Sequence, residues 1–306
     1  MPNFRVELTA VAAAAALAAP VIAQQPFKAG IDLVHLPVIV TARNGELVRG
    51  LKVEDFEVLE DGRPQKVSYF AEGAPGDALP LHLGLALDGS TSMERDLRKA
   101  GEAVVQFVRA LEEAEDVTFV DFDTSVNIGF FKPASYPHLF ERIRARKADG
   151  WTALYDAIGA YLERALSRPG QHVLLLYTDG GDSTSRMTFG QLQGLLRLSN
   201  VMVYVLGYLE NQMSSLRAPQ QMRMNQIARE TGGEAFYPAS IEELHEVYAK
   251  IVDELGSRYT LGYVSSNQKA DGKFREVQVR LIRPDLKNAK LRTRSGYMSP
   301  AGPRSR

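Results

Sequence analysis

Five consecutive residues, Asp88-Gly89-Ser90-Thr91-Ser92, bring together the side chains of this chain that are best suited to chemistry. They follow the apolar run Leu81–Leu87 and precede a helical pattern, so they should form a tight loop between a strand and a helix. One carboxylate and the hydroxyls of Ser90 and Ser92 are hard oxygen donors. Such donors suit Mg²⁺, Mn²⁺ or Ca²⁺ better than zinc or copper. The loop is therefore a candidate part of an oxygen-ligated metal site.

Two later segments could complete this site. Gly150-Trp151-Thr152 opens a helical pattern, and Tyr177-Thr178-Asp179-Gly180-Gly181-Asp182 follows the apolar run Val173–Leu176. Because the strands of a parallel α/β sheet end on the same side, we expect the three loops to meet there. The predicted ligands of one cation are Asp88, Ser90, Ser92, Thr152 and Asp179. With only two carboxylates, the site should keep bound water and an open position that a partner's carboxylate can take.

Each segment also has an ordinary structural interpretation. Ser90 or Ser92 could cap the following helix, Thr152 could cap the next one, and Asp179-Gly180 could be only a turn. Asp182 could join a water network around the metal, or it could cap the helix near Phe189. The occurrence of all three segments at matching strand ends favours the metal site.

The elements that must position these loops alternate between strands and helices from Pro80 to about Leu255. This alternation predicts a Rossmann-like, doubly wound α/β domain with a mostly parallel sheet covered on both faces. The predicted strands are Leu81–Leu87, Val117–Phe122, Val126–Phe131, Val173–Tyr177, Val201–Leu206 and Glu234–Tyr237, and the predicted helices are Leu97–Leu111, Leu154–Leu166, Phe189–Leu198, Met222–Thr231 and Ile241–Leu255. The second and third strands are separated by a short turn, which predicts one antiparallel edge strand.

Both flanks of this region have strand patterns. The N-terminal strands are predicted at Leu33–Val40, Phe56–Leu59 and Gln65–Phe70, and the C-terminal strands at Arg258–Val264, Phe274–Ile282 and Leu291–Thr293. Asp61-Gly62 indicates a hairpin. Neither flank is long enough to bury a core alone, so we expect the two to pair or pack together as one β module. The arginines and lysines of the C-terminal strands are interpreted as solvent-facing.

The whole chain has 306 residues, a formal net charge of -1 and no cysteine. The charge gives no reason to expect nucleic acid or a membrane surface as a partner. The lack of cysteine excludes disulfides and thiolate chemistry. Arg5 and the alanine-rich stretch Leu8–Ala19 predict a signal peptide over residues 1–23, hence a periplasmic or secreted protein without a transmembrane segment after cleavage. A retained N-terminal anchor or a disordered start is the alternative.

The three metal-site segments resemble the von Willebrand factor type A domain and its metal-ion-dependent adhesion site. The resemblance rests on Asp88, Ser90 and Ser92 in the pattern D-x-S-x-S, then Thr152, then Asp179. It implies that the two serines and Thr152 are direct or switchable ligands of the metal and that the two aspartates bind it directly or through water. The flanks, through segments 54–62 and 292–297, resemble exported bacterial proteins related to this family. One departure is Trp151, where many members have a second glycine.

The resulting prediction is an exported binding protein that captures the Asp or Glu carboxylate of a protein partner through Mg²⁺, with Mn²⁺ or Ca²⁺ as alternatives. The predicted organisation is a signal peptide at 1–23, an N-terminal β segment at 28–72, the von Willebrand A domain at 80–255, a C-terminal β segment at 256–298 and a disordered tail at 299–306. We predict no catalytic residues, because the five histidines are scattered and no hydrolase or phosphate-binding motif appears. The rivals are a metal-dependent hydrolase using the same cation and a structural envelope protein that binds through its β module.

Two further features surround the predicted site. Trp151 is interpreted either as an apolar rim that a partner contacts or as a side chain buried against the neighbouring helix. The basic cluster Arg142, Arg144, Arg146 and Lys147 could steer acidic partners. Its simpler interpretation is a solvated helix face.

Overall fold

The computed structural model describes residues 33–73, 80–111, 114–210 and 212–300. The predicted signal peptide at 1–23 and residues 301–306 of the predicted tail lie outside these ranges. Within them, no helix is both long and apolar enough to cross a membrane.

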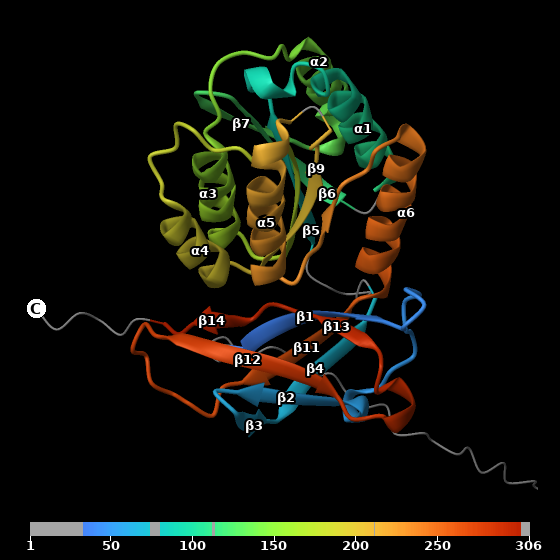
Figure 1. The fold of residues 1–306 in the computed structure, drawn as a ribbon. Helices are drawn as coiled ribbons and strands as arrows, with labels where there is room; N and C mark the ends of the chain where they lie inside the picture. The colour runs from blue at the N-terminus through green and yellow to red at the C-terminus, as the bar shows by residue number, and fades with distance from the viewer. Residues whose placement is uncertain (1–32, 74–79, 112–113, 211, 301–306) are drawn as a thin grey trace, which may run out of the picture. The chain divides into compact units, whose positions relative to one another are not determined.

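A six-stranded sheet forms the centre of the α/β region (Figure 1). Its strands follow the order β10-β9-β8-β5-β6-β7, and all neighbours are parallel except β6 and β7. The antiparallel edge strand predicted from the short turn is thus confirmed. The strands are β5 (Leu81–Asp88), β6 (Ala114–Phe122), β7 (Val126–Phe131), β8 (Gln171–Thr178), β9 (Val201–Gly207) and β10 (Ala235–Phe236).

Helices cover both faces of this sheet, as the alternating pattern predicts (Figure 1). Side chains of α1, α2 and α6 share one apolar cluster with the sheet, and side chains of α3, α4 and α5 share the other. The helices are α1 (Leu97–Ala110), α2 (Tyr136–Ala145), α3 (Leu154–Leu166), α4 (Phe189–Leu198), α5 (Ser214–Glu230) and α6 (Ile241–Ser257). The central strands are buried on both faces, which explains their continuous apolar runs.

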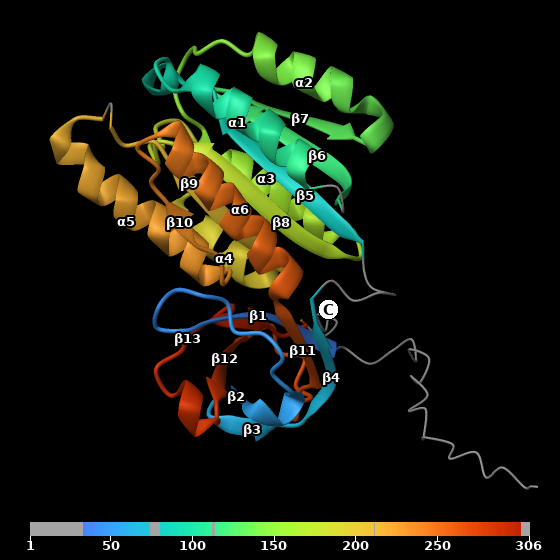
Figure 2. The same cartoon turned by 90° about the vertical axis from the view of Figure 1, so that its right-hand side faces the viewer.

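The two flanks pair with each other, as expected from their short lengths. The strands are β1 (Leu33–Thr41), β2 (Phe56–Glu60), β3 (Arg63–Gln65), β4 (Val67–Glu72), β11 (Tyr259–Val264), β12 (Phe274–Leu281), β13 (Lys290–Arg292) and β14 (Gly296–Met298). They form two antiparallel sheets, β13-β1-β11-β4 and β14-β12-β2-β3. Each sheet contains strands from both ends of the chain, as Figure 2 shows. Apolar side chains of both sheets meet in one core.

Several elements differ from the sequence-based expectations. Helix α2 was not predicted, because its apolar stripe consists of few residues, with Leu139 and Ile143 as its buried side chains. Helix α5 begins at Ser214 rather than near Met222, and it tolerates Pro219 close to its start. The Asp61-Gly62 turn does form a hairpin, but Gln65 ends the short strand β3, and β4 pairs with β11 instead.

Two expectations about the C-terminal β region are wrong. Arg275 and Arg294 are not solvent-facing: they are 4% and 6% exposed. The guanidinium of Arg275 keeps a charged partner in this buried position, because it forms an ion pair with Asp271, at 2.8 Å. Ser299 does not belong to a disordered tail, because its backbone N–H donates to the carbonyl of Lys273 and its hydroxyl donates to Asp271.

Candidate metal centre

Asp88 ends strand β5 and is completely buried. Its Oδ1 accepts hydrogen bonds from the backbone N–H of Ser90, at 3.0 Å, and from the Ser90 hydroxyl, at 2.6 Å. The Ser90 Oγ lies 3.1 Å from the Oγ of Ser92. The first loop therefore gathers its carboxylate and its two serine hydroxyls into one polar cluster.

The third loop joins this cluster from strand β8. The hydroxyl of Thr178 donates to Oδ2 of Asp88, at 2.6 Å. Asp179, 1% exposed, follows directly and accepts from the backbone N–H of Gly181, at 2.9 Å. Its second oxygen accepts from Nε2 of Gln212, at 2.6 Å, on the loop after β9. The two predicted carboxylate ligands thus lie at neighbouring strand ends, because β5 and β8 are adjacent in the sheet.

The second loop is bound to both of the others through its backbone. Next to the first loop, the N–H of Thr91 donates to the carbonyl of Gly150, and the N–H of Asp149 donates to the carbonyl of Gly89. Next to the third loop, Thr152 donates its N–H to the hydroxyl of Ser183 and accepts from the Ser183 N–H. Hydrogen bonds therefore connect the three loops that carry the five predicted ligands.

The capping interpretations of the hydroxyls are not borne out. Ser90 forms no side-chain cap, since its hydroxyl donates to Asp88 instead. The residue at the cap of helix α3 is Ala153, and Thr152 lies just before it. Asp182 is the group that serves α3: its Oδ1 accepts from the N–H of Tyr155, at 3.1 Å, rather than from the helix near Phe189.

The electrostatics of Asp88 favour a bound cation. Burial, followed by the negative charge of Asp179, raises the pKa of Asp88 to about 7. The hydrogen bonds to Asp88 come from hydroxyl and backbone N–H groups, which leave its charge uncompensated. A divalent cation between the two carboxylates would supply the missing positive charge.

The donor set also fits a hard cation. It consists of carboxylate and hydroxyl oxygens, the ligands that Mg²⁺ and related ions prefer. In the described part of the chain, no three or more His, Cys, Asp or Glu side chains gather as a group that could hold a metal ion.

The basic cluster is in part structural. Arg142 donates to Oδ2 of Asp121 through Nε, at 2.9 Å, and Arg146 pairs with Asp123. The guanidinium of Arg146 lies so close to Gly89 that a Cβ on this glycine would be 2.3 Å from its Nε. The solvated-face interpretation is therefore wrong for Arg142, which pairs with strand β6, and for Arg146, which packs against the first loop, whereas Arg144 and Lys147 are exposed.

Trp151 is 69% exposed, so the interpretation as a buried ring is wrong. Its backbone is nevertheless held firmly, because its N–H donates to the hydroxyl of Thr124 at 2.9 Å. Trp151 stands where many family members have a second glycine, and it exposes its indole ring to solvent directly beside Thr152.

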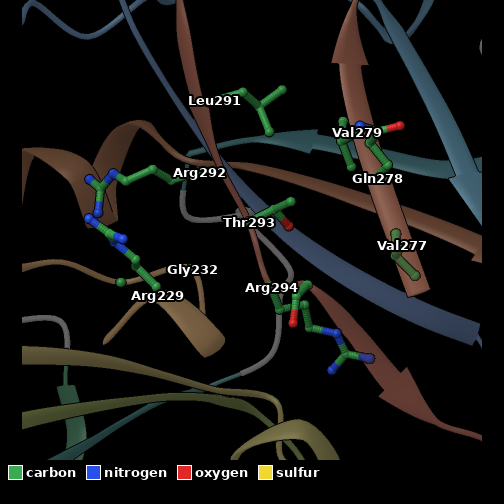
Figure 3. Close-up of a pocket in the computed structure, with 11 residues that line it drawn as sticks. Arg229, Gly232, Val277, Gln278, Val279, Leu291, Arg292, Thr293 and Arg294 are labelled. Carbon is green, nitrogen blue, oxygen red and sulfur yellow. The ribbon is translucent and has the colours of Figure 1, made fainter. Parts of the chain in front are cut away.

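A cavity of about 290 Å³ lies elsewhere in the molecule and contains none of the predicted ligands (Figure 3). Its lining comes from β12, β13 and the turn at Gly232-Gly233. The charged residues of this lining are Arg229, Arg292 and Arg294, so the cavity does not suit a cation.

Thr178 and Gln212 are two residues of the site that the sequence motifs do not predict. Thr178 carried a signal, since it lies within the third segment and next to Asp179. Gln212 carried none, because it is 33 residues from Asp179 and follows a strand without any motif. Only the folded loop after β9 brings its amide to the carboxylate.

The family comparison agrees with the arrangement of these three loops. The family model of the von Willebrand factor type A domain matches residues 82–250, more than half of the chain. The chain belongs to this family. Comparison with curated proteins found no match.

Solved structures of similar fold include three bacterial proteins. The D319A mutant of the PilB minor pilin from Streptococcus sanguinis is 15% identical with a TM-score of 0.48, over 59% of this chain and 62% of the pilin. The conserved hypothetical protein BatB from Bacteroides thetaiotaomicron is 15% identical with a TM-score of 0.45, over 58% of this chain and 100% of BatB. The von Willebrand factor type A protein from Catenulispora acidiphila is 13% identical with a TM-score of 0.48, over 91% and 76% of the two chains.

Proposed function

We propose that this von Willebrand A protein is an adhesion-type module that binds a protein partner through a divalent cation. The cation, Mg²⁺ in the first instance, would be held by the hydroxyls of Ser90, Ser92 and Thr152 together with the carboxylates of Asp88 and Asp179. Its role would be to attract and orient an Asp or Glu carboxylate of the partner at the remaining coordination position.

The observation that carries this proposal is the buried Asp88 carboxylate within a cluster of hydroxyls. An ionised carboxylate without a positive neighbour is costly to bury, and a cation removes that cost. The proposal is further supported by the grouping of three of the predicted ligands, since the Ser90 hydroxyl donates to Asp88, at 2.6 Å, and lies 3.1 Å from the hydroxyl oxygen of Ser92.

The proposal includes export to the periplasm or the exterior. It is supported by the alanine-rich stretch at 8–19 and by the absence of cysteine, which leaves the fold independent of the redox state of its compartment.

The experiment that tests the function is capture of partners from a cell-envelope extract on immobilised protein, with Mg²⁺ or with EDTA. Wild-type protein should capture a partner only with Mg²⁺, and Asp88→Ala should capture none while its circular dichroism stays that of the wild type. Asp149→Ala is the matched control, because this exposed acid lies in the second loop but is not a predicted ligand. Capture that survives both EDTA and Asp88→Ala would disprove the proposal.

A further inference from the structure

The cavity of about 290 Å³ has a lining whose charges are all positive. Its charged residues are Arg229, Arg292 and Arg294, and none of the described residues that line it carries a carboxylate. Hydrogen-bond donors and positive charge at the wall of a cavity attract anions. The cavity is therefore a candidate site for a small anionic ligand.

Three side chains of this lining contain buried polar atoms that lack a hydrogen-bond partner among the described residues. The atoms are Nη1 of Arg292, Nε of Arg294 and the hydroxyl oxygen of Thr293. Buried polar atoms are nearly always hydrogen-bonded, and leaving one without a partner costs free energy. The guanidinium nitrogens are donors only, and the hydroxyl can donate, so a ligand that satisfies them must bring acceptor oxygens.

The arrangement of these side chains places the centre of the site. Figure 3 shows the side chains of Arg229 and Arg292 pointing toward one another, whereas that of Arg294 extends in another direction. Two positive charges that face each other repel, and an anion between them replaces this repulsion by attraction. The facing pair of Arg229 and Arg292 is therefore the place where an anion gains most.

The acidic groups beside Arg292 do not fill this place. Glu254 lies 2.5 Å from Nη2 of Arg292, and Glu234 lies 3.4 Å from the same nitrogen, so both acids approach one end of the guanidinium. Both are also close to the ammonium of Lys250, at 3.9 and 3.0 Å. Their negative charge is thus shared between two cations, and Nη1 of Arg292 remains available to a ligand.

The other two arginines have no acidic partner. None of the ion pairs among the described residues includes Arg229 or Arg294. Glu230, which accepts from the hydroxyl of the lining residue Ser295, pairs with Arg197 at 3.0 Å. Burial lowers the pKa of Arg294 to about 10, so this guanidinium still carries its charge at neutral pH. The unmatched charge at the cavity is therefore positive.

A phosphate group fits these donors better than a carboxylate. A phosphate ester has three acceptor oxygens and between one and two negative charges at neutral pH. Two arginines can each bind it through two N–H groups, and an oxygen remains for the hydroxyl of Thr293. The apolar part of the lining consists of Val277, Val279 and Leu291, which suits a ligand that also carries a small apolar group.

We propose that this cavity binds a small soluble phosphate ester. Its phosphate lies between Arg229 and Arg292 and accepts from the hydroxyl of Thr293, and its apolar group contacts the two valines and the leucine of the lining. The site is independent of the proposed metal-bridged function, because the cavity contains none of the predicted metal ligands.

The test is calorimetric titration of phenyl phosphate into the full chain in EDTA, so that no cation at the metal centre can bind the phosphate. One equivalent should bind, about tenfold tighter than inorganic phosphate, because the phenyl ring buries apolar surface. Benzoate, which has the same ring but only a carboxylate, should bind at least tenfold more weakly than phenyl phosphate.

Two variants assign the binding to this cavity. Arg229→Gln should weaken phenyl phosphate binding at least tenfold, and the matched control is Arg164→Gln, since Arg164 is an exposed arginine on α3 outside the lining. Thr293→Val keeps the shape of the side chain and should weaken binding about fivefold. Its free energy of unfolding, measured in urea, should not fall, because the lost hydroxyl has no partner in the described chain.

Three outcomes would overturn the proposal. The first is that the wild type does not bind phenyl phosphate, and the second is binding that neither Arg229→Gln nor Thr293→Val weakens. The third is sedimentation with phosphatidylcholine vesicles only when they contain phosphatidic acid, without binding of phenyl phosphate, which would assign the cavity to a lipid headgroup. Binding of inorganic phosphate as tight as that of phenyl phosphate would refute the role of the apolar lining.

Discussion

At the scale of single residues, the candidate site is defined by how its carboxylates are held. Asp88 has both oxygens engaged by hydroxyl or N–H groups, and Asp179 has both engaged by N–H donors. Each carboxylate oxygen has two lone pairs, so these bonds orient the groups and still leave lone pairs for a cation. The surrounding hydrogen-bond donors thus fix the orientation of the Asp88 and Asp179 carboxylates.

Gln212 provides a residue-scale prediction. Its amide orients Asp179, so Gln212→Leu should weaken Mg²⁺ binding about tenfold, the lower range for residues that support metal ligands. Isothermal titration calorimetry measures the affinity for Mg²⁺. Gln226→Leu is the control, because Gln226 is an exposed glutamine on helix α5. If Gln212→Leu binds Mg²⁺ as tightly as the wild type, Gln212 has no positioning role.

At the scale of elements, strand β5 positions Asp88 because it is packed tightly on both faces. Gly84 lies four residues before Asp88, and the ring of Tyr161 from α3 rests directly against it. A Cβ on Gly84 would lie 2.3 Å from Cε2 of Tyr161, and this ring is only 2% exposed, so it cannot move aside. The glycine therefore permits the close approach of helix and strand.

This packing predicts that Gly84→Ala is destabilising by about 1 to 3 kcal/mol, the usual cost of overpacking. Gly194→Ala is the control, because a Cβ at this position in α4 would meet no heavy atom within 4 Å. It should instead stabilise the protein by about 0.5 to 1 kcal/mol, since alanine favours helix. Urea denaturation measures both changes, and equal effects of the two substitutions would contradict this account of β5.

At the scale of the whole molecule, strand and helix patterns were sufficient to predict the architecture. The central strands are long apolar runs, and the Asp-Gly turn indicated its hairpin, so these elements could be predicted from local sequence. Whether β4 would continue the hairpin with β2 or pair with β11 depended on contacts about 190 residues apart, beyond any local pattern. Burial of Arg275 and Arg294 was missed for the same reason, because their environments are assembled by distant segments.

Some features of the candidate site could likewise be predicted from the sequence, and others could not. The oxygen ligands could be predicted because they follow apolar strands directly, where parallel topology brings loops together. The exposure of Trp151, the bracing of the loops by Arg146 and the contact of Gln212 with Asp179 depend on side-chain packing and could not be predicted. The site thus joins segments near residues 88, 152, 179 and 212, and a bound cation would connect three of them directly.

The most direct test of this account is a calorimetric titration of Mg²⁺ into the wild type and into Asp88→Asn at pH 8, where most Asp88 carboxylates should be ionised because the pKa is about 7. Asparagine keeps the shape and the Oδ1 acceptor but removes the charge. We predict one Mg²⁺ site in the wild type and at least a hundredfold weaker binding in Asp88→Asn, with unchanged circular dichroism, as loss of a charged ligand requires. Equal affinity in the two proteins, or no binding by the wild type, would contradict the account.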